Sequence, residues 1–101
     1  MFKIAALYHF APVADPVQMQ STVKMRCEEL EIKGTLLIAN EGINGTISGA
    51  AANIDSILDF LSSIPEFADL VWKLSTSPEQ PFARLKVRLK REIVTMRQPD
   101  V

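Results

Sequence analysis

The residues best suited to chemistry form one alternating run, Arg84-Leu85-Lys86-Val87-Arg88-Leu89-Lys90. Successive side chains of a β-strand point to opposite faces, so this spacing places Arg84, Lys86, Arg88 and Lys90 on one face and the apolar residues on the other. Neighbouring cations in such a row are ~6.6 Å apart, and the row is about 20 Å long. The pattern predicts a binding surface for an anionic polymer.

The same run has a second interpretation, as a solvated edge strand whose cations prevent sheet-to-sheet aggregation. No acidic residue lies between Phe82 and Arg91, and this favours binding because a merely solvated face usually mixes both signs of charge. Phe82 and Trp72 are candidate stacking surfaces for nucleobases, with the core as the alternative place for both side chains. The sequence leaves both alternatives open.

A second candidate is the glycine-containing segment Asn40–Gly45, whose backbone N–H groups could surround a phosphate as in anion-binding nests. It lacks the Lys-Ser/Thr pair of a P-loop and the spacing of a dinucleotide-binding motif. We therefore interpret it as a hairpin loop with Asn44-Gly45 in the tight turn. Glu41 is a candidate catalytic carboxylate only beside a partner acid, base or metal, and the sequence identifies none.

Cys27 and His9 are the remaining candidates for catalysis. A nucleophilic cysteine needs exposure and a lowered pKa, but Cys27 falls on the apolar stripe of a predicted helix, so we expect it to be buried. His9 falls in a predicted strand, where a structural imidazole is the simpler interpretation. No nucleophile, base and oxyanion site can be assembled from these residues, and we predict no catalytic residue and no metal site.

The composition is that of one ordinary globular domain. The chain has 101 residues, of which 48% are hydrophobic and 23% charged. A single Cys excludes an internal disulfide, and no Cys/His cluster has zinc-ligand spacing. No apolar run approaches the ~18 residues of a membrane span, and Tyr8, His9 and Pro12 interrupt the one stretch that is similar to a signal peptide. We expect a cytoplasmic protein without a membrane partner.

The charge of the chain is divided unevenly along its length. Residues 1–72 contain four basic and nine acidic residues, whereas residues 73–101 contain seven basic and three acidic residues. The net charge of −1 therefore hides a local excess of positive charge in the C-terminal third. Such a distribution can attract an anionic partner even when the whole chain is nearly neutral.

Apolar periodicity and turn signals predict two helices among five strands. Asp15-Pro16 is an N-cap followed by proline at the first helical position, and Gly34 is the expected end of that helix. The expected elements are a buried strand at 2–10, a helix from 16, strands at 35–39 and 46–48, a helix at about 53–64, a strand around 70–75, and a last strand from 82 to about 95. This order predicts an α+β, ferredoxin-like split βαβ fold, with an antiparallel sheet, two helices on one face and an extra strand.

Two segments of the sequence resemble a known family. They are Lys33-Gly34-Thr35-Leu36-Leu37-Ile38-Ala39-Asn40-Glu41-Gly42-Ile43-Asn44-Gly45-Thr46-Ile47-Ser48-Gly49 and Leu85-Lys86-Val87-Arg88-Leu89-Lys90-Arg91-Glu92-Ile93-Val94-Thr95-Met96. In this order and spacing, after Asp15-Pro16, they are similar to the N-terminal domain of the bacterial rhodanese-domain tRNA uridine hydroxylases. The resemblance covers nearly the whole chain, and Arg97 departs from it where many members have glycine.

The resemblance implies an acylphosphatase-like domain at residues 1–96, with 97–101 beginning the linker to a rhodanese domain that is absent from this chain. It implies an enzyme that uses molecular oxygen as co-substrate to hydroxylate the wobble uridine of tRNA to 5-hydroxyuridine. Cys27 does not match the catalytic cysteine of the family, so no catalytic residue and no cofactor is expected in this chain. The implied partners are tRNA and the rhodanese domain of the same protein, with Arg84, Lys86, Arg88 and Lys90 as RNA-binding residues.

Two other functions remain open. An autonomous acylphosphatase-type hydrolase should have an arginine in a phosphate-binding loop after the first strand, but residues 10–16 contain neither Arg nor Gly. A docking or oligomerisation domain would instead pack its open sheet face against the rhodanese partner without touching RNA. Fold class alone does not decide between these functions.

Overall fold

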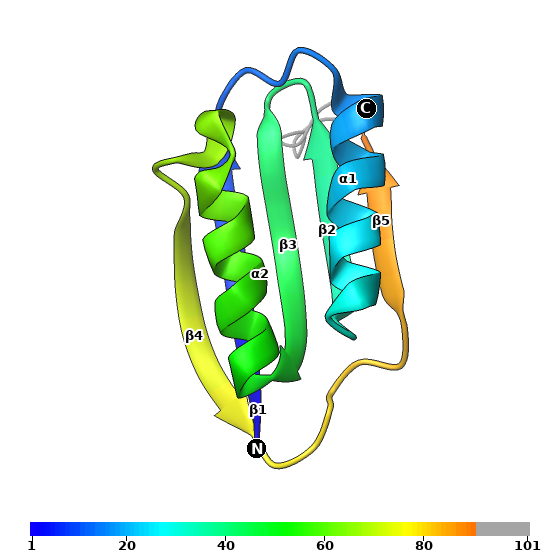
Figure 1. The fold of residues 1–101 in the computed structure, drawn as a ribbon, viewed down its shortest axis with the longest axis vertical. Coiled ribbons are helices and arrows are strands. Elements are labelled where there is room, and N and C mark those ends of the chain that lie inside the picture. Colours follow the sequence, from blue (N-terminus) through cyan, green and yellow to red (C-terminus); the bar gives the residue numbers. More distant parts are fainter. Residues whose placement is uncertain (91–101) are drawn as a thin grey trace, which may run out of the picture.

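The computed structural model describes residues 1–90 (Figure 1). Its elements follow the predicted order, with one additional 3-10 helix, η1. They are β1 (Phe2–Phe10), α1 (Pro16–Glu29), β2 (Lys33–Ala39), β3 (Gly42–Ala50), α2 (Ala51–Ser63), η1 (Pro65–Phe67), β4 (Val71–Ser77) and β5 (Leu85–Leu89). The predicted last strand therefore begins later than expected, at Leu85, and its predicted part beyond residue 90, like the predicted domain boundary at 96, lies outside the described residues.

The sheet has five strands in the order β4-β1-β3-β2-β5. Both helices lie on the same face of it, as Figure 1 shows, and the predicted ferredoxin-like fold is confirmed. The expectation of an antiparallel sheet is wrong at one edge, because β5 pairs with β2 in parallel. The reason is topological: the chain leaves β4 at one edge and crosses the end of the sheet to reach the opposite edge, where it runs in the direction of β2.

Helix α1 begins as predicted and ends earlier than predicted. The Asp15 side chain accepts a hydrogen bond from the backbone N–H of Gln18, at 3.1 Å, and caps the helix. At the other end Glu31 adopts a left-handed backbone with φ 56°, and the backbone N–H of Ile32 donates to the Cys27 carbonyl oxygen at 2.9 Å. This is a Schellman ending formed by a non-glycine residue. Gly34 lies inside β2 and does not end the helix.

The hairpin between β2 and β3 is tighter than the sequence predicted. Ala39 pairs with Gly42, so the turn consists of Asn40 and Glu41 alone. Asn44 and Gly45 lie within β3 and not in the turn, because strand pairing continues past them on both sides of β3. The segment that was expected to be a loop is therefore mostly part of the sheet.

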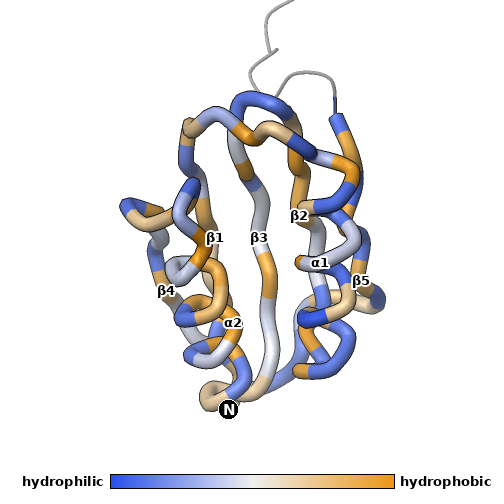
Figure 2. The backbone as a smooth tube through the Cα atoms, turned by 45° about the horizontal axis from the view of Figure 1, so that its top comes forward, coloured by the Kyte–Doolittle hydropathy of each residue, from blue (hydrophilic) through white to orange (hydrophobic). Residues whose placement is uncertain are grey.

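The hydrophobic core lies between the sheet and the two helices. The odd-numbered residues of β1 and β3 and the even-numbered residues of β2 point toward the helices, and Ala5, Ile47 and Leu36 are fully buried there. Figure 2 shows hydrophobic and hydrophilic segments alternating along both helices, as expected for helices that bury one side. No helix in residues 1–90 is long and apolar enough to cross a lipid bilayer.

Candidate nucleic-acid interface

The cationic row occupies β5 and its two flanking residues. The side chains of Arg84, Lys86, Arg88 and Lys90 are all exposed, whereas Val87 is 7% exposed and packs into the core. The predicted division of this strand into a wet and a buried face is therefore confirmed. Leu89 departs from it, since 42% of its surface is exposed near the end of the strand.

The backbone of β5 is fixed along its whole length. The Arg84 carbonyl oxygen accepts from the Gly34 N–H at 3.0 Å, and the Lys90 N–H donates to the Ile38 carbonyl oxygen at 2.8 Å. On the outer edge, the Gln20 side chain of α1 donates to the Val87 carbonyl oxygen at 2.7 Å. The four cations are thus held in a row by a strand that is bonded to β2 on one side and contacted by a helix residue on the other.

The open face of the sheet carries one further cation, Lys73, at its other edge. Strand register places Lys73 of β4, Ala6 of β1, Thr46 of β3, Thr35 of β2 and Lys86 of β5 in one line across the sheet. Four strand-to-strand steps of ~4.8 Å make this line about 19 Å wide. The open face is therefore bounded by a lysine on each side.

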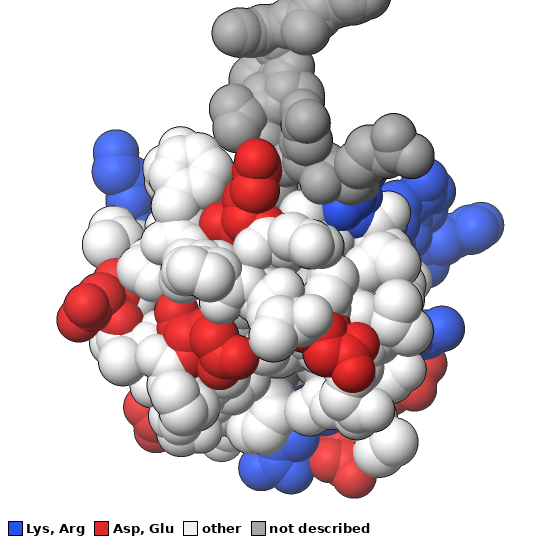
Figure 3. All heavy atoms as spheres, turned by 90° about the horizontal axis from the view of Figure 1, so that it is seen from above, with Lys and Arg blue, Asp and Glu red and all other residues white. Residues whose placement is uncertain are grey.

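The strands of the described structure contain no acidic residue. The carboxylates of residues 1–90 lie instead on the helices and in the connections between elements. In Figure 3, which looks onto the end of the molecule where β2 and β3 are joined, carboxylates are spread over much of the view, and cationic side chains project at its periphery, with the largest group at the upper right, on the side of β5. The sheet therefore presents a face of positive charge.

Two aromatic side chains of β1 also lie on this open face. Tyr8 is 52% exposed and Phe10 49% exposed, and their ring centroids are 5.0 Å apart in an edge-to-face arrangement. The expectation of a buried strand at 2–10 is therefore wrong for one of its two faces, because both helices cover the other face. The signal in the sequence that could have identified these rings is the period of two in a strand, which places Tyr8 and Phe10 on one face and Ala5 and Leu7 on the other.

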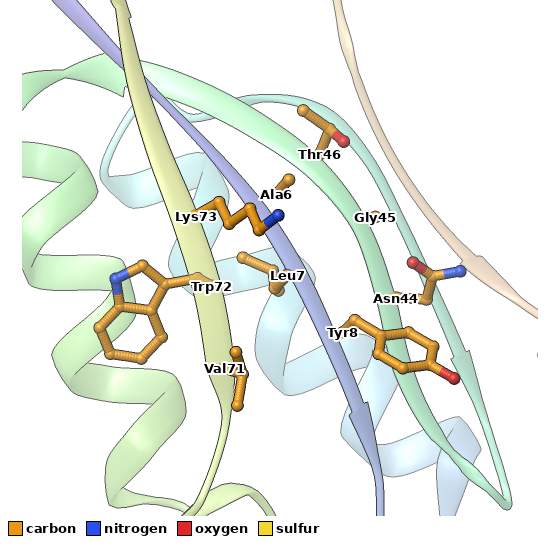
Figure 4. A pocket seen from close by; sticks show the side chains of 9 residues that line it. All are labelled: Ala6, Leu7, Tyr8, Asn44, Gly45, Thr46, Val71, Trp72 and Lys73. Carbon is orange, nitrogen blue, oxygen red and sulfur yellow. The ribbon is translucent and has the colours of Figure 1, made fainter.

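A shallow hollow of about 490 Å³ lies beside Tyr8 on the open face. Its lining includes Ala6, Asn44, Thr46 and Lys73, and Figure 4 shows the Tyr8 ring next to Asn44 and the Lys73 side chain extending toward Ala6. The hollow exists because the small Ala6 side chain is surrounded by longer ones.

The two stacking candidates predicted from the sequence fall in different places. Trp72 is half-buried and packs against the core, on the side of β4 that faces the helices. Phe82 is half-buried and lines a second hollow, of about 480 Å³, together with Thr35, Arg84 and Lys86. Phe82 therefore stays a candidate contact beside the cationic row, whereas Trp72 is part of the core.

Cys27 is fully buried, as predicted. Burial, and secondarily the negative charge of Glu28, raises the pKa of its thiol to about 12. A thiol in this state is not a nucleophile at neutral pH.

This raised pKa predicts a specific loss of stability at alkaline pH. The unfolded thiol ionises near pH 9 and the folded thiol near pH 12, so the free energy of unfolding should fall between these values by about 1.4 kcal/mol per pH unit. Cys27→Ala should lack this contribution, and urea unfolding of both proteins from pH 8 to 11 measures the difference. Parallel pH profiles of the two proteins would contradict it.

The other catalytic candidates do not form a site. The His9 ring packs edge-on against Phe67, with centroids 6.3 Å apart, as expected of a structural histidine. Among residues 1–90 no group of three or more His, Cys, Asp or Glu side chains is placed to hold a metal ion. Glu41 is exposed in the β2–β3 turn and belongs to no such group.

Comparison with known proteins identifies the family. Residues 2–93 match the family described as "UPF0176 acylphosphatase like domain". The chain belongs to this family. The acylphosphatase-like fold that the resemblance implied is therefore confirmed for this UPF0176 domain.

The relatives of this UPF0176 domain are longer proteins named "tRNA uridine(34) hydroxylase". One from Gluconobacter oxydans (strain 621H) is 48% identical over 99 residues, which cover 98% of this chain and 32% of the relative. One from Roseobacter denitrificans is 48% identical over 101 residues, or 100% of this chain and 34% of the relative. One from Rhizobium etli is 50% identical over 100 residues, which cover 99% of this chain and 32% of the relative. The chain thus spans about a third of the length of these relatives.

Solved structures share the fold of the UPF0176 domain at low sequence identity. The acylphosphatase from Bacillus subtilis has a TM-score of 0.63 at 15% identity, covering 86% of this chain and 98% of that one. The BLUF protein BlrB has a TM-score of 0.65 at 22% identity, covering 87% of this chain and 68% of that one. These similarities establish the architecture and carry no statement about activity.

The loop after β1 of the UPF0176 domain is closed against the β2–β3 turn. The backbone N–H of Ala11 donates to the Glu41 carbonyl oxygen at 2.9 Å, and that of Val13 donates to the Asn40 carbonyl oxygen at 2.8 Å. These two N–H groups are therefore engaged and do not point into an anion site. Together with the missing arginine of this loop, this arrangement does not support acylphosphate hydrolysis.

Proposed function

We propose that this chain is the tRNA-contacting N-terminal domain of an enzyme that hydroxylates the wobble uridine of tRNA to 5-hydroxyuridine. The observation that carries the proposal is the row Arg84, Lys86, Arg88 and Lys90, exposed on a sheet face whose strands contain no acidic residue. The names of the relatives, tRNA uridine(34) hydroxylase, supply the substrate and the reaction of the whole protein.

The four cations contact backbone phosphates in this proposal. Phosphate contacts supply affinity and orientation, whereas the choice of sequence is left to groups that reach the bases. The rest of the enzyme, with a rhodanese domain as the neighbour of this one, carries out the hydroxylation with molecular oxygen as co-substrate. Because its substrate is tRNA, we place the protein in the cytoplasm.

A docking domain that never touches RNA is the alternative. It is favoured by exposed apolar side chains on β4, where Val71 is 65% and Leu74 47% exposed. Such a domain would use this edge against another part of the enzyme, and charge reversal on β5 would leave RNA binding by the enzyme unchanged.

A salt-dependent titration of this chain with bulk tRNA tests the proposal. We expect the wild-type chain to bind, with the logarithm of the binding constant falling against the logarithm of the salt concentration at a slope of about −2 to −3. Each cation that neutralises one phosphate contributes ~0.7 to this slope. The double variant Lys86→Glu/Lys90→Glu should lose this binding. A wild type that does not bind, or a double variant that binds equally well, would contradict the proposal and favour the docking domain.

The matched control reverses two cations on α1, which lies on the other face of the sheet. Lys24→Glu/Arg26→Glu changes the net charge by the same amount. It removes the exposed ion pair between Arg26 and Glu29, whose stabilising contribution is ~0 to 1 kcal/mol, and the contact of the Arg26 guanidinium with the Phe60 ring, 5.5 Å from its centroid. This control variant should lose less affinity for tRNA than Lys86→Glu/Lys90→Glu, because only the long-range effect of net charge changes. Equal losses in both double variants would show a non-specific charge effect.

A further inference from the structure

The open face of the sheet offers more than phosphate contacts, because an aromatic ring and a hollow lie between its two cationic edges. We propose that Tyr8 and the hollow beside it form a binding site for an unpaired nucleobase of single-stranded RNA. The inference rests on the proposed function and extends it, since it names the class of RNA that the domain engages and a subsite separate from the cations of β5.

The Tyr8 ring is placed to stack on a base. It stands on β1, the second strand of the sheet, with half of its surface exposed. Strand register puts Val71 on one side of it and Asn44 on the other. Phe10, two residues further along the same face, supports the Tyr8 ring edge-on and is itself half exposed. Exposed aromatic rings on a sheet are a common way to bind successive bases of a single strand.

The hollow supplies polar groups at the side of this ring. Its volume of about 490 Å³ lies within the ~300 to 1,000 Å³ typical of ligand pockets. The side chains of Asn44 and Thr46 line it, and within residues 1–90 neither takes part in a hydrogen bond. An amide offers both a donor and an acceptor to the edge of a base, and a hydroxyl offers the same. The Lys73 ammonium at the rim is placed for the adjoining phosphate.

The charge of the face identifies the occupant as a nucleic acid. An apolar protein segment would need only the aromatic patch, but this patch lies between Lys73 at one edge and Lys86 and Arg88 at the other, on strands without acidic residues. A polyanion that carries flat rings matches both features. The nucleic acid must be single-stranded because the faces of paired bases are covered by their neighbours in a duplex.

Fluorescence anisotropy with two labelled probes, a short oligouridylate and an RNA duplex of similar length, tests the inference. Tyr8→Ala should weaken oligouridylate binding about 5- to 150-fold, the range for loss of one base–aromatic stack. It should leave duplex binding and the salt slope for oligouridylate unchanged, because no cation is removed. Tyr8→Phe keeps the ring and should bind like wild type.

The control variants separate this inference from the proposed function. Met25→Ala removes an apolar side chain that is 61% exposed on α1, and it should change neither affinity. Lys86→Glu/Lys90→Glu should weaken both probes and reduce the salt slope. If Tyr8→Ala binds oligouridylate like wild type while the lysine variant fails, the base site is wrong and the phosphate row stands. If the wild-type chain binds neither probe, both the base site and the phosphate row are wrong.

Discussion

Replacing Gly45 with alanine should destabilise the domain by about 3 kcal/mol, because it strains the backbone and overpacks the middle of the sheet. Gly45 has φ +154°, which side chains rarely allow, and a Cβ built there would overlap the backbone carbonyl of Thr35 on β2. That neighbour is the backbone of an interior strand and cannot move aside without breaking pairing. Urea unfolding of Gly45→Ala and wild type measures the loss.

Gly49 provides the matched control on the same strand. Its φ is not in the left-handed region, and an added Cβ would meet the terminal methyl of Ile32 at 2.9 Å, which is the flexible end of a side chain. Gly49→Ala should therefore cost less than about 1 kcal/mol. Equal losses at the two glycines would show that Gly45 is not held in this conformation.

Replacing Phe67 with alanine should cost about 3 to 5 kcal/mol, the range for removing a fully buried aromatic side chain. Phe67 of η1 is 0% exposed and lies in the core beside His9. A domain of this size has a net stability of ~5 to 15 kcal/mol, so the variant should lose a large share of it. Thermal and urea unfolding followed by circular dichroism measure the change.

Phe10 is the matched residue on the other face of the sheet. Because half of its surface is already exposed, Phe10→Ala should cost less than about 1.5 kcal/mol, including the loss of its edge contact with Tyr8. The contrast between the two phenylalanines tests which face of the sheet is core. A large loss at Phe10 would mean that the open face is covered in the folded protein, and it would contradict the proposed interface.

Edge protection and RNA binding predict different roles for the same cations. β5 does lie at an edge of the sheet, as edge protection requires, and the Gln20 side chain already donates to its outer backbone at Val87. The exposed cations, however, point along the open face and not along that edge, and they share this face with Tyr8 and Lys73. Edge protection does not require an aromatic ring or a hollow, whereas a nucleic-acid surface uses both.

Local signals in the sequence were sufficient for most of the elements. Asp15-Pro16 identified the start of α1 because capping depends on residues that are adjacent in the chain. The stripe that contains Val23 and Cys27 identified its buried side. The end of the helix at Glu29 was missed because the left-handed Glu31 that follows it carries no compositional signal.

The errors concern contacts between segments that are distant in the chain. Asn44-Gly45 has the composition of a tight turn, yet both residues are in a strand, because the register of β3 against β1 and β2 extends through them. The parallel pairing of β5 with β2 was also missed, since nothing in the residues of β5 states which edge it joins. Strand register and strand order depend on the packing of the whole sheet.

The sequence by itself determined that Arg84, Lys86, Arg88 and Lys90 share one face, because alternation is a local property of any strand. Only the tertiary structure decided what lies on that face with them. The helices cover one side of the sheet, so Tyr8, Asn44 and Lys73 from three other strands share with the cations of β5 the side that stays open. Their presence on one face follows from strand order and strand pairing. Both depend on packing between segments that are distant in the chain, and neither has a signature in any one segment.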